Sequence, residues 1–128
     1  MLIQGEEEEL FAGEIKDFVL EAINEKLSKA RPDSRRAHVL RDIFESNGYE
    51  KLAEKMEREI KRLFKGYNGM TSSIKRGLQS SGFTISEEGK HYKLKLGDDS
   101  RYMVTVSKTP SDHREGENTA ATICRMLF

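Results

Sequence analysis

The spacing of apolar residues changes from helical to alternating after Gly82, and this change limits the folds open to the chain more than any other feature. Upstream, apolar residues recur every three or four positions, as they do along one face of an amphipathic helix. Downstream, apolar and polar residues alternate in three short segments, which lie at 83–86, 91–96 and 101–107. Such alternation is typical of half-buried strands. The chain is therefore expected to join a helical region to a small antiparallel sheet.

Three amphipathic helices are expected before the sheet, behind an acidic lead at residues 1–9. They are predicted near 14–31, 34–47 and 49–66. Pro32 ends the first, because a proline disfavours helical backbone in the residue that precedes it. Asp33 or Ser34 can cap the second, and Gly48 suits its C-terminal end.

A shorter helix and a final helix are expected to flank the three strands. A hydroxyl side chain at position 71, 72 or 73 can cap the first of these, and Asn118 can cap the last, which is predicted at 119–127. The fold class is therefore α+β. A three-helix region over residues 1–66 is followed, over residues 67–128, by an α-β-β-β-α unit with a three-stranded antiparallel sheet.

The composition excludes several classes of site. Lys and Arg total 22, as do Asp and Glu, so a nucleic-acid role would need a local basic patch. The single cysteine, Cys124, lies in an apolar helical pattern and is predicted to be a small buried side chain. One cysteine forms neither an intramolecular disulfide nor a cysteine metal cluster. Asp98 and Asp99 fit a turn better than a metal site, so no metal or cofactor is predicted.

The N-terminus is acidic and lacks the basic and apolar regions of a signal peptide. No apolar run approaches the ~20 residues that a membrane-spanning helix needs. The prediction is a soluble, cytoplasmic protein without a membrane partner.

Strand pairing can be predicted from the apolar residues, because opposed residues of an antiparallel pair share one face of the sheet. In the second hairpin this pairs Leu96 with Tyr102 across the turn 97–101. The same register sets His91 opposite Ser107.

The first hairpin is expected to pair Ile85 with Tyr92 across the turn 87–90. This register sets Ser86 opposite His91. Two helices are available to cover the apolar face, so the opposite face is expected to stay open. His91 is then predicted on that open face, in the middle strand.

Two histidines lie beside fixed positive charge. His91 stands between Lys90 and Lys93, and His113 precedes Arg114 in the loop after the third strand. Imidazole suits proton transfer near neutral pH, and nearby cations suit a phosphodiester. A loop histidine such as His113 is also often simply exposed.

Five cations are candidates for phosphate contact, since lysine and arginine give sequence-independent affinity for nucleic acid. They are Lys90, Lys93, Lys95, Lys108 and Arg114. Lysines on an open sheet face also serve solubility alone, and that interpretation of Lys93 and Lys95 stays open.

The motifs of the C-terminal half resemble a known family. Gly82-Phe83 opens the first strand, Gly89-Lys90-His91-Tyr92 opens the second, and the third runs into a loop with His113 and Gly116 before the last helix. This order is similar to that of the HicA-like toxins, small RNA-cleaving proteins with a double-stranded-RNA-binding-domain-like fold. The likeness covers roughly residues 74–127. Lys90 departs from it, since the family tends to have a small residue there.

The resemblance implies a metal-independent endoribonuclease of the mRNA interferase kind, with His91 as the catalytic residue and Lys93 or Arg114 stabilising developing charge. RNA and an antitoxin protein would be its partners. Two other functions stay open. One is a non-catalytic RNA-binding module. The other is a protein-interaction component whose N-terminal helices form a homodimer or bind another protein, which the net neutrality and the acidic lead favour.

Overall fold

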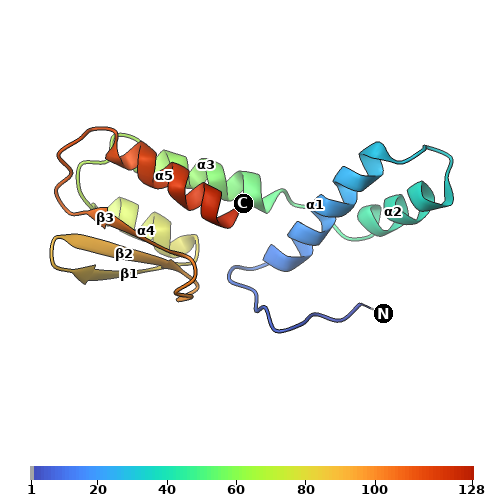
Figure 1. Ribbon diagram of the computed structural model, residues 1–128, viewed down its shortest axis with the longest axis horizontal. Coiled ribbons are helices and arrows are strands. Elements are labelled where there is room, and N and C mark those ends of the chain that lie inside the picture. The colour runs from blue at the N-terminus through green and yellow to red at the C-terminus, as the bar shows by residue number, and fades with distance from the viewer. Residues whose placement is uncertain (1) are drawn as a thin grey trace. The chain divides into compact units, whose positions relative to one another are not determined.

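The computed structural model describes residues 2–128 and confirms the predicted α+β class. Its elements follow the predicted order (Figure 1): α1 (Glu14–Lys29), α2 (Arg35–Glu45), α3 (Leu52–Phe64), α4 (Ser72–Ser80), β1 (Phe83–Glu88), β2 (His91–Leu96), β3 (Met103–Ser107) and α5 (Glu115–Leu127). The chain forms two compact units, one up to Ala53 and one from Glu54. The sequence pattern placed the division after Gly66. The boundary between the two compact units falls within α3, whose later residues Ile60, Leu63 and Phe64 are buried.

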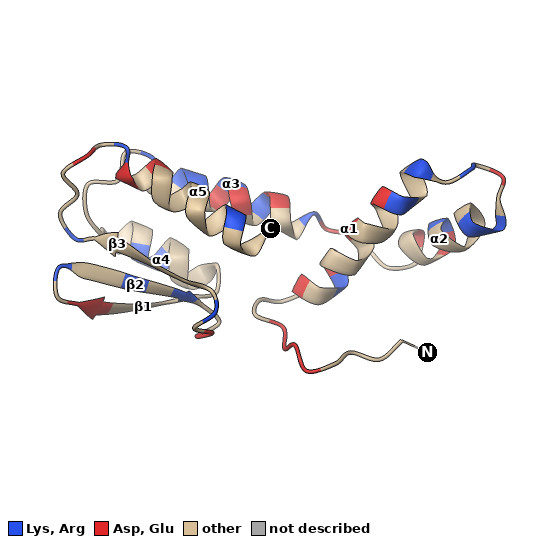
Figure 2. Cartoon of the chain, in the orientation of Figure 1, with Lys and Arg blue, Asp and Glu red and all other residues tan. Residues whose placement is uncertain are grey.

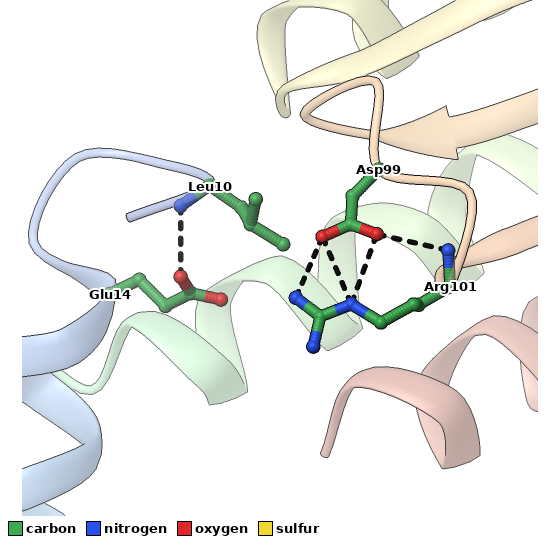
Figure 3. A network of polar contacts seen from close by, with 4 residues as sticks. All are labelled: Leu10, Glu14, Asp99 and Arg101. Carbon is green, nitrogen blue, oxygen red and sulfur yellow. Dashed lines mark hydrogen bonds and ion pairs between the residues drawn. The ribbon is translucent and has the colours of Figure 1, made fainter. Parts of the chain in front are cut away.

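The first unit is built on α1 packed against α2. Leu20 of α1 and Ala37 of α2 are its most buried apolar residues. Ser34 caps α2, since its hydroxyl accepts a hydrogen bond from the Ala37 amide (3.1 Å), as one of the two predicted caps. The start of α1 is closed by Glu14, whose carboxylate accepts from the Leu10 amide (2.9 Å), as Figure 3 shows.

A buried carboxylate fastens the start of α3 to α1. Asp17 is only 3% exposed, and its two oxygens accept from the amides of Glu50 (2.9 Å) and Leu52 (2.7 Å). The first amides of a helix lack partners within the helix, and an acceptor there stabilises it. Lys51 between them has a left-handed φ of 56°.

We expect Asp17→Ala to destabilise the first unit by roughly 1–2 kcal/mol, because two helix-start amides lose their acceptor. Thermal unfolding followed by circular dichroism measures the change. Asp17→Asn is the matched control, since its one amide oxygen keeps one of the two hydrogen bonds and should lose less. Equal stability of all three proteins would contradict this role of Asp17.

The second unit is a three-stranded antiparallel sheet with strand order β1-β2-β3. Helix α4 packs against β1 and α5 against β3, and the helices lie on one side of the sheet (Figure 1). The core between the layers includes Ile60, Phe64, Leu78, Leu94, Leu96, Val106 and Ile123. The predicted covering of the apolar face by two helices is therefore confirmed.

A glycine lets α5 approach the end of α3 closely. A Cβ atom on Gly116 would lie 2.3 Å from the Phe64 carbonyl oxygen and 2.6 Å from the Tyr67 Cβ. Gly116 was expected just ahead of the last helix. It lies instead in the first turn of α5, which begins at Glu115 rather than at Thr119. The helix starts earlier because Asp112 turns the chain, accepting from the Arg114 amide (2.9 Å).

The second hairpin has the predicted register. His91 opposes Ser107, and Leu94 opposes Val104. The Leu96 amide donates to the Tyr102 carbonyl (3.0 Å), which continues the pairing to the predicted turn.

The first hairpin differs from its predicted register by two residues. β1 runs on to Glu88, which pairs with His91, so the turn consists of Gly89 and Lys90 alone. Gly89 has a φ of 58° and Lys90 does not have a positive φ, as in the two-residue turns that begin with glycine. Ser86 therefore opposes Lys93. A shift of two residues keeps every side chain on its predicted face.

No helix of residues 2–128 is both long and apolar enough to cross a membrane. Cys124 is buried in α5 as predicted, and burial raises the pKa of its thiol.

Candidate nucleic-acid interface

The face of the sheet opposite the helices carries polar and charged side chains. By strand alternation this open face comprises Thr84, Ser86, Glu88, His91, Lys93, Lys95, Met103, Thr105 and Ser107. Figure 2 shows basic segments on β2 and an acidic end of β1. The face therefore offers an imidazole, two ammonium groups and several hydroxyls, which suit a phosphodiester chain better than an apolar ligand.

His91 is an exposed residue at the start of β2. Ser107 opposes it on β3, as predicted, and Glu88 opposes it on β1 in place of the predicted Ser86. The histidine thus stands between a hydroxyl and a carboxylate.

Lys93 is already paired on the open face. Its ammonium forms an ion pair with the Glu88 carboxylate, and the hydrogen bond from Lys93 lowers the pKa of Glu88. Half of the positive charge predicted beside His91 is therefore balanced by the protein itself. Lys95, two positions further along β2, has no ion-pair partner among residues 2–128.

Lys108 lies away from the open face. Its ammonium is 3.2 Å from a Glu87 carboxylate oxygen and 5.3 Å from the centre of the Tyr92 ring. Tyr92 belongs to the helix-covered face, since it alternates with His91 and Lys93. The structure therefore does not bring Lys108 together with the lysines of β2. Lys90 lies exposed in the first hairpin turn.

His113 and Arg114 lie in the loop before α5. The His113 side chain is 90% exposed, with Nδ1 3.7 Å from an Asp112 carboxylate oxygen. It lines a cavity of about 270 Å³ with residues 66–68 and 110–112. Within residues 2–128, neither a hydrogen bond nor an ion pair links His113 to His91. The two histidines do not form a directly bonded pair.

Tyr67 and Glu115 hold the end of β3 beside His91, and the sequence pattern did not single out either residue. The Tyr67 hydroxyl donates to the Ser107 carbonyl (2.8 Å), and a Glu115 carboxylate oxygen accepts from the Ser107 amide (3.0 Å). Burial raises the pKa of Tyr67 to about 12, so its hydroxyl keeps its proton at neutral pH. The two contacts fix the backbone of the serine that faces His91.

No group of three or more His, Cys, Asp or Glu side chains among residues 2–128 converges as a metal site would require. Asp99 is engaged by Arg101, whose amide donates to it at 2.9 Å and whose guanidinium forms an ion pair at 2.9 Å (Figure 3). The hydrogen bond from the Arg101 side chain lowers the pKa of Asp99. Asp99 therefore serves the turn between β2 and β3.

Comparison with known proteins identifies no relative of the chain. No protein-family model matches the chain, and comparisons with curated proteins and with solved structures find no match.

Proposed function

We propose that the chain binds RNA in the cytoplasm through its open sheet face and cleaves it without a metal ion, using His91. The observation that carries the proposal is the position of His91: an exposed imidazole in the middle strand, with Ser107 beside it and Lys93 and Lys95 in line along β2. The resemblance of the C-terminal motifs to HicA-like toxins supports the same assignment.

The chemistry requires few groups. Cleavage next to a 2′-hydroxyl needs a base that takes its proton, an acid for the leaving oxygen and a cation near the phosphate. A histidine exchanges protons near neutral pH. In the proposal His91 performs a proton-transfer step, Lys95 holds the phosphate, and the Ser107 hydroxyl contacts the sugar-phosphate backbone.

The test is incubation of the purified full chain with bulk RNA in the presence of EDTA, together with filter retention of RNA at low and high salt. Cleavage in EDTA would support the nuclease. Retention without cleavage, lost at high salt, would reduce the proposal to RNA binding. A protein that neither retains nor cleaves RNA would reject the proposal.

The ion pair between Lys93 and Glu88 makes a specific prediction about affinity. Glu88→Gln is expected to tighten RNA binding roughly two- to fivefold at low salt. The reason is that the Glu88 carboxylate no longer competes with RNA phosphates for the Lys93 ammonium. Fluorescence anisotropy with a labelled RNA measures the change.

Glu57→Gln is the matched control for that experiment. It also removes one negative charge and one ion pair, that of Lys61 and Glu57 (2.8 Å), but it lies on α3. An equal gain in RNA affinity from both variants would show that the effect comes from net charge. It would contradict RNA binding at the open face.

A further inference from the structure

β3 lies at an edge of the sheet, so one side of its backbone is not paired with a strand. The Leu96 amide donates to the Tyr102 carbonyl, and the Lys108 amide donates to the Lys90 carbonyl. The backbone amide and carbonyl groups of the even-numbered residues of this segment therefore point toward β2. Antiparallel pairing alternates, so the amide and carbonyl groups of Met103, Thr105 and Ser107 point outward.

The outward groups differ in their partners. Those of Ser107 are both occupied, by the Tyr67 hydroxyl and the Glu115 carboxylate. The outward backbone groups of Met103 and Thr105 have no hydrogen-bond partner within residues 2–128. The open part of the edge is therefore limited to two residues that flank Val104.

This edge lacks the usual protection. Natural edge strands commonly carry charged residues or proline that prevent pairing with another chain. β3 reads MVTVS, without charge, proline or glycine, whereas β1 at the other edge ends in two glutamates. Met103 is exposed despite being apolar. A cavity of about 510 Å³ lies beside the edge, between β3 and α5, and is lined by Met103, Val104, Thr105, Glu115, Asn118, Thr119 and Thr122.

We infer that β3 pairs antiparallel with β3 of a second copy of this chain, about a two-fold axis at Val104. Met103 of each copy then opposes Thr105 of the other. Each such pair exchanges two backbone hydrogen bonds, and symmetry doubles them. Registers that depend on Ser107 are excluded because its outward groups are already bound.

The side chains agree with the same register. Val104 meets Val104 of the second copy on the helix-covered side, beside the two cavities. The two sheets form one six-stranded sheet whose open faces are continuous. This pairing of two copies does not require bound RNA.

The experiment compares the wild type with Thr105→Pro by light scattering over a concentration series. Proline is tolerated where the amide faces away from the sheet, so the variant should keep the β2–β3 pairing and lose the outward donor. The wild type is expected at twice the chain mass of 14.7 kDa, and the variant at the single-chain mass. Glu87→Pro is the matched control, since it places proline at an outward position of β1, and it should remain a dimer.

A monomeric wild type at every concentration would overturn the inference. So would a dimer that persists in Thr105→Pro, because the contact would then lie elsewhere, as on the exposed Val19 and Ile43 of the first unit. If the variant does not fold, amide hydrogen exchange of the wild type decides. The Met103 and Thr105 amides should be protected at high concentration and exchange freely on dilution, and concentration-independent exchange would reject the dimer.

Discussion

His91→Ala is expected to lower the rate of RNA cleavage by about 10²–10⁴-fold, the usual contribution of a positioned proton-transfer group. The side chain is exposed at the start of β2 and contributes no burial to the core, so the fold should persist. Binding should change much less, because Lys93 and Lys95 remain. Single-turnover cleavage of a labelled RNA in EDTA, together with anisotropy on the same RNA, separates the two effects.

His38→Ala is the control for this substitution. His38 is also an exposed histidine, but it lies on α2 in the first unit. The His38→Ala protein should cleave RNA at the wild-type rate. Equal cleavage by wild type and His91→Ala would remove His91 from the mechanism. His113→Ala tests the other histidine. A loss similar to that of His91→Ala would indicate that the loop before α5 reaches the same phosphate when RNA is bound.

Gly116→Ala is expected to destabilise the second unit by about 3 kcal/mol, the upper end of the usual cost of overpacking. The added Cβ would meet the Phe64 carbonyl oxygen at 2.3 Å and the Tyr67 Cβ at 2.6 Å. Phe64 is the last residue of α3 and Tyr67 lies three residues after it, so the end of the helix itself must move. The midpoint of thermal unfolding should fall by more than about 10 °C for a unit of this size.

Gly5→Ala is the matched control, because a Cβ there has no neighbour within 4 Å. Its stability should match the wild type. A Gly116→Ala protein as stable as the wild type would mean that α5 can move away from α3 at no cost. Loss of the Tyr67–Ser107 hydrogen bond is expected to accompany the destabilisation, since Tyr67 lies against Gly116.

The face of the sheet on which each side chain lies could be predicted from the sequence, because successive residues of a strand alternate between the two faces. His91, Lys93 and Lys95 alternate with Tyr92, Leu94 and Leu96, and the helices take the apolar set. The exact partner of His91 on β1 was not predictable in the same way. Turns of two and of four residues leave every side chain on the same face, so the hydrophobic pattern cannot separate them.

The contacts around Ser107 lay outside what local patterns encode. Tyr67 follows a helix that precedes the whole sheet, and only tertiary packing brings its hydroxyl to β3. The ion pair between Glu88 and Lys93 depended on the turn length that the hydrophobic pattern left undecided. Local signals served better at the starts of α2 and α4, where Ser34 and Thr71 each accept from an amide three positions ahead. The predicted Asn118 cap was wrong, because α5 begins at Glu115.

The Tyr67–Ser107 hydrogen bond has a kinetic consequence. It joins residues 40 positions apart and encloses α4 and all three strands, so it cannot form until the intervening chain has folded. Until then the outward carbonyl of Ser107 is open along with the outward groups of Met103 and Thr105. The nascent strand thus exposes a longer edge than the finished one, and mispairing between chains is most probable in that interval. Closure by Tyr67 ends that interval.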